Sequence, residues 1–152
     1  MIRKYKRTDI DTLVDIWYKG SLQSHSFIEA NYWRSQMSEM KETYIPMSET
    51  YVKIHQSRVI GFISMLDNYL AALFVDVSFQ NNGAGRELLH FIQDQREVIE
   101  LKVYKDNSSA LRFYLNNGFC IKEELTDEQT DMPEYLMEWK KTTCLQDEER
   151  NS

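Results

Sequence analysis

The stretch AALFVDVSFQNNGAGRELL, residues 71–89, determines how the rest of the chain is arranged. It begins with an apolar run, 71–77, rich in the Val and Phe that favour a buried strand. It continues through 80–85, where Asn and Gly tolerate positive φ angles or bond their own backbone. After this segment, apolar residues recur at the spacing of one helix face: Leu88, Leu89, Phe91 and Ile92. The stretch therefore predicts a strand, a glycine loop and a helix in succession.

A glycine loop between a strand and a helix directs several backbone N–H groups toward one point. The helix N-terminus adds partial positive charge there, so the loop suits an anion. It is not a Walker A loop, because Arg86 and Glu87 stand where that motif needs lysine and a hydroxyl residue. It is not a dinucleotide fingerprint either, because Leu88 stands where that motif requires a small residue. An ordinary strand-to-helix turn is the simpler alternative.

Composition limits the class of protein. The 152 residues suit one domain, expected over 1–141 and followed by a polar, frayed tail over 142–152. A net charge of -6 disfavours nucleic acid as a partner. No apolar run approaches the roughly 20 residues that span a bilayer, and no signal segment is visible. With only Cys120 and Cys144, we expect a cytoplasmic protein without a structural metal or a membrane partner.

The remaining patterns alternate between strand and helix and predict an α/β fold with a mixed sheet. Strands are predicted at 2–6, 50–54, 59–66, 69–77, 99–103, 119–125 and 135–139. About four helices are predicted: 10 onward, 28–40, 84–96 and 107–116. Gly20 and Ser21 are expected to interrupt the first helix, and Pro46 to end the second helical region. The first four strands should form an antiparallel meander and the last two a C-terminal pair.

A second informative stretch is LKVYKDNSSALRFYLNNGF, residues 101–119. Asn107 and Tyr114 are seven residues apart, about two helical turns, so both side chains can face one groove. The alternative is that Asn107 only caps a helix and that Phe113 and Tyr114 are core aromatics.

Together the two stretches resemble the GNAT superfamily of acyl-CoA-dependent N-acetyltransferases. The loop is similar to that family's pyrophosphate loop, Arg/Gln-x-x-Gly-x-Gly/Ala, at Gln80, Gly83 and Gly85. The second stretch is similar to the family's segment after the fifth strand, and the matching residues are Asn107, Ala110, Phe113, Tyr114, Gly118 and Phe119. One departure is Val77, where many members have proline. The resemblance implies a GNAT-like fold in which strands four and five run parallel and splay apart.

The resemblance also implies acetyl-CoA as the acyl donor, with no metal. Its pantetheine arm would pair with the exposed backbone of the fourth strand as an added strand. Its pyrophosphate would lie on the loop amides, with Gln80 ordering the loop and Arg86 either in contact or solvated. The residues implied to hold the donor are Val75, Val77, Gln80, Asn82, Gly83, Ala84, Gly85, Arg86, Asn107, Ala110, Phe113 and Tyr114.

The implied reaction is direct acetyl transfer, in a ternary complex, to a primary amine of a small molecule or peptide. The Val75 N–H would stabilise the developing oxyanion, Tyr114 would protonate the departing thiolate, and Asn107 would position the pantetheine or a water. A non-catalytic acyl-CoA-binding regulatory domain, or a partner-binding domain, is the alternative.

The residues of the acceptor side stay open at this point. Candidates for the base are His25, Glu29, Asp76 or an ordered water. Each residue also has a simpler explanation: His25 as a solvated loop residue, Glu29 as a carboxylate favoured at a helix start, and Asp76 as a side chain on the other face of the sheet. Segment 123–134 carries a charge of -6 and is either a solvated loop or a surface that steers cationic amines. The sequence selects neither the acceptor, the acyl length nor the oligomeric state.

Overall fold

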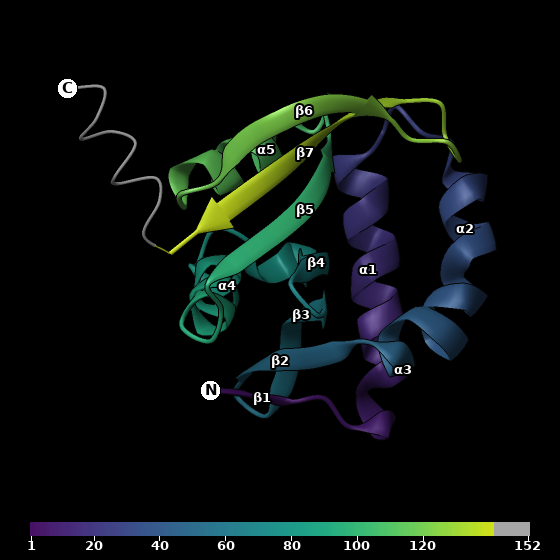
Figure 1. Cartoon of the computed structure of the whole chain (residues 1–152). Helices are drawn as coiled ribbons and strands as arrows, with labels where there is room; N and C mark the ends of the chain where they lie inside the picture. The colour runs from purple at the N-terminus through teal and green to yellow at the C-terminus, as the bar shows by residue number, and fades with distance from the viewer. Residues whose placement is uncertain (142–152) are drawn as a thin grey trace. The chain divides into compact units, whose positions relative to one another are not determined.

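The computed structural model describes residues 1–141 (Figure 1). The predicted tail, 142–152, lies outside the described residues. The chain divides into two compact units, Met1–Phe91 and Ile92–Ser152. That division reflects where contacts cluster, and the prediction of a single domain over 1–141 stays a prediction.

The first unit is an antiparallel sheet whose strands follow one another in the order β1-β2-β3-β4. This order confirms the predicted meander. The strands are β1 (Ile2–Lys4), β2 (Glu49–His55), β3 (Arg58–Leu66) and β4 (Tyr69–Val75). The helices are α1 (Ile10–Ser24), α2 (Ala30–Glu39), α3 (Ile45–Met47) and α4 (Ala84–Gln93), the last ending just past the division between the units. Two short 3₁₀ turns, η1 (Arg7–Asp9) and η3 (Val77–Phe79), and the π-helical η2 (Met40–Tyr44) complete it.

Helices cover both faces of this sheet. Residues alternate along β2, so Tyr51 and Lys53 point to one face. Both contact α4, Tyr51 through the Phe91 ring, whose centroid lies 4.8 Å away, and Lys53 through Glu87. The opposite face carries the stacked rings of Phe62 and Phe74 and packs against α1. The side chains of β2 that reach α4 therefore lie beneath the helix that follows the glycine loop.

The first helix is continuous, so the prediction that Gly20 and Ser21 interrupt it is wrong. α1 runs from Ile10 to Ser24 without a break. A Cβ added to Gly20 would lie 2.7 Å from Cδ1 of Phe74. Gly20 is therefore a point of close approach between α1 and β4, where only a residue without a side chain leaves room for the ring.

The second helical region is longer than predicted. α2 continues through η2 into α3, and the chain becomes extended only at Ser48, with φ −92° and ψ 157°. Pro46 lies in the short α3, one residue before the last helical position, Met47. The prediction that this proline marks the end of the helical region is therefore correct to within about a turn.

The second unit is a three-stranded antiparallel sheet with one helix. Its strands are β5 (Val98–Tyr104), β6 (Cys120–Thr126) and β7 (Pro133–Lys140), in the order β5-β7-β6, and its helix is α5 (Ser108–Asn116). The predicted C-terminal strand pair is thus confirmed. Gly118 follows the C-cap of α5, Asn117. Its φ is +93° and an added Cβ would lie 3.0 Å from Trp139 Cδ1, which makes glycine the residue that fits.

Candidate functional site

β4 ends two residues earlier than predicted. The Asp76 carboxylate accepts a hydrogen bond from the Ser78 N–H at 2.9 Å, and this bond turns the chain into η3. Val77 therefore lies outside the strand, with its side chain 42% exposed. The prediction that the strand reaches Val77 is wrong for this reason, and the predicted direction of Asp76 stays a prediction.

The Val75 N–H points toward the edge of β4 that does not face β3. The next residue, Asp76, donates its N–H to the Ile60 carbonyl at 2.7 Å. Because successive N–H groups of a strand point to opposite edges, that of Val75 points away from β3. This direction is the one that the implied role of Val75 as an oxyanion donor requires.

The loop between η3 and α4 has the geometry of an anion cradle. Asn81 and Gly83 have φ angles of +67° and +84°, and the first helical bond runs from the Glu87 N–H to the Gly83 carbonyl at 3.0 Å. None of the N–H groups of residues 81–86 donates to an acceptor within residues 1–141. A Cβ on Gly83 would meet only Glu87 Oε1, at 4.0 Å. The loop thus offers open backbone donors at the positive end of a helix.

The side chains around this loop carry both signs of charge. Gln80 Nε2 lies 3.4 Å from the Val75 carbonyl, a long contact that links the loop to β4. Arg86 is exposed and makes no ion pair within the described part of the chain. Lys53 and Glu87, which the sequence did not single out, form an ion pair beside the loop. The sequence does show an acidic residue, Glu87, in the first turn of a helix. It does not show its partner, because Lys53 lies 34 residues earlier on β2.

The three candidates for the base have different surroundings. The carboxylate of Asp76 is engaged by the Ser78 N–H and by Arg58, whose Nη2 lies 3.3 Å away. Glu29 is exposed and directly precedes α2, where the helix dipole favours a carboxylate. His25 is half-buried, with ring centroids of Phe27 and Trp33 at 5.8 and 5.1 Å. Burial lowers the pKa of His25 to about 4, so the ring is uncharged at neutral pH.

The lowered pKa of His25 predicts a specific loss of stability in acid. The unfolded chain takes up this proton near pH 6.5 and the folded chain only near pH 4, so protonation favours unfolding between those values. Relative to a His25→Gln variant, the wild-type free energy of unfolding should fall by about 2–3 kcal/mol between pH 7 and pH 4. Urea unfolding of both proteins across this range measures the difference. Parallel pH profiles would contradict the assignment.

In the second unit, Asn107 and Tyr114 occupy the positions of a cap and a core residue. Asn107 Oδ1 accepts the Ala110 N–H at 3.2 Å and so caps α5. Tyr114 is 8% exposed, and its ring lies edge-on to those of Phe113 and Phe119, at 5.2 and 5.3 Å. The simple structural interpretation of both residues is therefore correct, and their implied roles in the reaction stay predictions.

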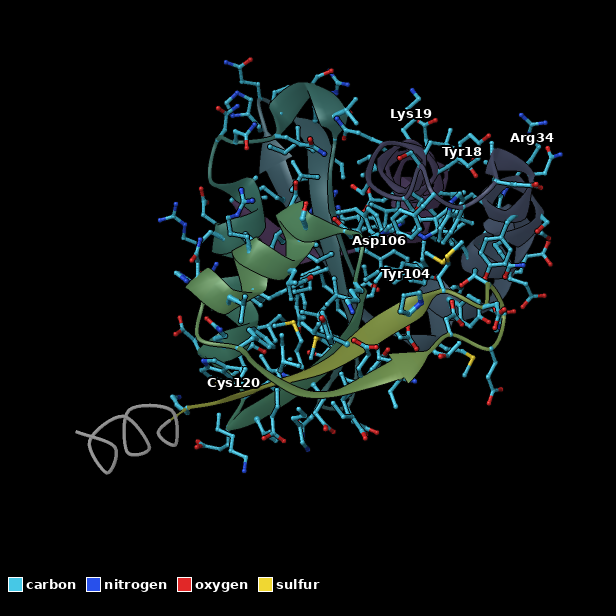
Figure 2. The ribbon with its side chains drawn as sticks, turned by 90° about the horizontal axis from the view of Figure 1, so that it is seen from above. Tyr18, Lys19, Arg34, Tyr104, Asp106 and Cys120 are labelled. Carbon is cyan, nitrogen blue, oxygen red and sulfur yellow. The ribbon has the colours of Figure 1, made fainter. Side chains whose placement is uncertain are left out.

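The acidic segment is mostly strand, and its turn is held to β5. Glu123 and Glu124 lie in β6 and Glu134 in β7, which leaves 127–132 as the turn. Asp127 accepts hydrogen bonds from the Tyr104 hydroxyl at 2.5 Å and the Thr130 hydroxyl at 2.9 Å (Tyr104 is labelled in Figure 2).

The acid groups of this turn titrate differently. Burial alone would raise the pKa of Asp127, but the hydrogen bonds from Tyr104, Gln129 and Thr130 lower it below its ordinary value. Burial and the neighbouring Asp127 raise the pKa of Glu134. Asp127 therefore remains an anion fixed in place.

Metal-binding groups and membrane-spanning helices bear on two of the predictions. Within residues 1–141, no three His, Cys, Asp or Glu side chains are grouped so that they could hold a metal ion. The same residues contain no helix that is long and apolar enough to cross a membrane. The predictions of no metal and no membrane partner stay predictions.

The fold matches that of solved acetyltransferases. The solution structure of apo YjaB from Escherichia coli is 22% identical, with a TM-score of 0.81 over 91% of this chain and 96% of that chain. An aminoglycoside 6'-N-acetyltransferase complexed with coenzyme A is 17% identical, with a TM-score of 0.68 over 92% and 96%. The predicted fold class, a mixed α/β sheet of this type, is confirmed. The predicted splay between strands four and five stays a prediction.

Sequence comparison gives the class and then the family. Peptidyl-lysine N-acetyltransferase YiaC of Escherichia coli is 29% identical over 140 residues, 91% of this chain and 96% of the relative. Spermidine N(1)-acetyltransferase of Thermoplasma acidophilum is 26% identical over 160 residues, 91% and 96%. Fold, loop and relatives define an acetyltransferase enzyme that acts on an amine, and they do not favour a non-catalytic module. The family model described as Acetyltransferase (GNAT) domain matches residues 18–139, and the chain belongs to that family.

Proposed function

We propose that this enzyme transfers the acetyl group of acetyl-CoA to the side-chain amine of lysine in a protein or peptide. The observation that carries the donor is the set of N–H groups over 81–86, which have no acceptor within the described residues and lie at the start of α4. The acceptor is supported by the relative named for peptidyl-lysine, which aligns over nearly its whole length.

Acetyl-CoA supplies an activated thioester and a diphosphate. The residues present fit the diphosphate, because the amides of 82–86 are open and Gly83 leaves the space above them unfilled. Gln80 links this loop to the end of β4, where the Val75 N–H points away from β3. The loop would hold the anion, and Val75 would donate to the thioester oxygen as negative charge develops there.

Two residues of the second unit carry the remaining proposed roles, and the family motif supports them. The amine nitrogen, deprotonated by a base or an ordered water, forms a bond to the acetyl carbon as the carbon–sulfur bond breaks. The nitrogen then releases its second proton to water, and the sulfur takes one up. Tyr114 would supply it, since a phenol of ordinary pKa near ~10 can protonate a thiolate whose conjugate acid lies near ~8.5. Asn107 would position the pantetheine or a water.

The charge of the acidic turn supports a cationic acceptor. Glu128 and Asp131 are exposed on the turn that Asp127 fixes to β5. Such a turn attracts protonated amines over several ångströms and does so less at high salt. The acidic pI of about 5.1 disfavours nucleic acid as a partner. A cytoplasmic location is proposed on the two cysteines, which have no disulfide spacing.

An amine panel tests the acceptor. The purified enzyme with acetyl-CoA should acetylate lysine-containing peptides at Nε, detected by thiol release and mass spectrometry, and the rate should fall several-fold from 50 to 300 mM salt (roughly, from the Debye length). Spermidine belongs in the panel, because the Thermoplasma relative is named for it. Acetylation of spermidine alone would replace lysine as the acceptor. No transfer to any amine would remove the proposed function.

A further inference from the structure

A carboxylate stands next to the loop that is proposed to bind a diphosphate. Glu87 lies in the first turn of α4, and its N–H bonds the carbonyl of Gly83. Its Oε1 lies 4.0 Å from where a Cβ of Gly83 would be. The carboxylate is thus within one helical turn of the open amides of 82–86. A bare negative charge there would oppose the binding of an anion.

Lys53 neutralises this carboxylate from the sheet below. Its Nζ lies 2.5 Å from Glu87 Oε2, and its side chain is 16% exposed against 52% for Glu87. The hydrogen bond to Lys53 is the largest cause that lowers the pKa of Glu87, and the Met1 ammonium adds a weaker attraction. Lys53 therefore reaches Glu87 from β2, beneath α4, and the pair is only partly open to water.

We propose that Lys53 is a positioning residue for acetyl-CoA: it acts through Glu87, whose carboxylate it pairs with and so keeps from repelling the diphosphate. This inference rests on the proposed function of the loop. Lys53 lies on β2, outside the loop motif, and would nevertheless influence the affinity for acetyl-CoA. Lys53 itself need not touch the donor.

The proposal follows from the sizes of the charges involved. Without Lys53, the carboxylate of Glu87 keeps its charge and loses its nearest partner, so the diphosphate meets a like charge beside the loop. At an effective dielectric constant near ~20, two unit charges even ~10 Å apart repel enough to weaken binding by about tenfold. Without Glu87, the ammonium of Lys53 is unpaired and attracts the diphosphate. The two single changes should therefore shift affinity in opposite directions.

Three variants test this prediction by steady-state kinetics with a fixed amine. Lys53→Met should raise the KM for acetyl-CoA about tenfold with kcat within about twofold. Glu87→Gln should lower KM by about two- to fivefold. The double variant should return to within about twofold of the wild-type KM, since both charges of the pair are then absent. Lys53→Arg should keep the wild-type KM.

S-acetyl-pantetheine, which carries the thioester without the diphosphate, is the matched donor. Its kcat/KM should be the same for wild type and Lys53→Met. The control variant Lys41→Met removes a cation whose exposed partner is Asp11, 3.0 Å away on α1, and should leave the KM for acetyl-CoA unchanged.

Each outcome decides one point. A Lys53→Met effect that persists in the double variant, or with S-acetyl-pantetheine, would show a packing defect and overturn the proposal. So would unchanged KM values in Lys53→Met and Glu87→Gln. If Lys53→Met does not fold, the direction of the Glu87→Gln shift decides alone. A wild-type enzyme without acetyl-CoA-dependent transfer would instead refute the proposed function, which the variants do not address.

Discussion

Tyr114→Phe should lower kcat by about 10²–10⁴-fold while the Kd for acetyl-CoA changes by less than about twofold. The substitution removes only the hydroxyl, and the ring keeps its edge-on contacts with Phe113 and Phe119. Without that hydroxyl, the departing sulfur must take its proton from water. Single-turnover kinetics at saturating amine, together with calorimetric titration of acetyl-CoA, separate the chemical step from binding.

An exposed tyrosine serves as the control for this substitution. Tyr44 is 45% exposed on η2, and Tyr44→Phe should leave both constants unchanged. An activated thioester donor gives a second signature. Its leaving thiol is more acidic and needs less help from a proton donor, so the loss of kcat in Tyr114→Phe should be smaller with this donor. Turnover of Tyr114→Phe at the wild-type rate would remove Tyr114 from the acid role and leave it a core aromatic.

Gly83→Val should weaken acetyl-CoA binding at least about tenfold, with the folded structure otherwise intact. Gly83 has a φ of +84°, where a β-branched residue is strained by about 1–2 kcal/mol. The chain can relieve that strain only by rotating the peptides that carry the open amides of 82–86. Because a hydrogen bond to a charged group contributes about 1.5–3 kcal/mol, the loss of one such bond already gives this factor.

A residue with a positive φ in another turn provides the matched control for the loop. Ser57, in the turn between β2 and β3, also has a positive φ, +66°, so Ser57→Val introduces similar strain outside the loop and should leave the affinity for acetyl-CoA as it is. Calorimetric titration and the ligand-induced rise in Tm measure both variants. If Gly83→Val bound acetyl-CoA as tightly as the wild type, the loop would not be the diphosphate site.

Most of the fold was predictable because the deciding signals are local. The glycine loop, the Asn107 cap and the Gly118 helix end are each specified by residues within one or two turns of each other. Alternating apolar residues likewise specified the meander, since each hairpin joins neighbours in the chain. The resemblance to a known family then added the roles of residues that periodicity alone describes only as cap and core.

What the sequence did not predict depends on contacts between distant segments in two cases and on a local side-chain hydrogen bond in a third. Gly20 looked like a helix break, and its partner Phe74 comes from a strand 54 positions later (74 − 20). The end of β4 is set by the Asp76 carboxylate and the Ser78 N–H, a competition with the strand that an apolar pattern does not register. Lys53 and Glu87 form a pair only once β2 lies beneath α4.

The tie between Tyr104 and Asp127 has a consequence for how acceptor preference can diverge among related enzymes. Asp127 supports the turn by accepting hydrogen bonds from Tyr104 and Thr130, whereas the side chains of Glu128 and Asp131 are exposed and make no hydrogen bond or ion pair within residues 1–141. Glu128 and Asp131 can therefore be substituted while Asp127 keeps the backbone of the turn in place. To favour a neutral or acidic acceptor, Glu128→Lys and Asp131→Asn are the first substitutions to make, because they change the charge of the turn and leave the hydrogen bonds of Asp127 in place.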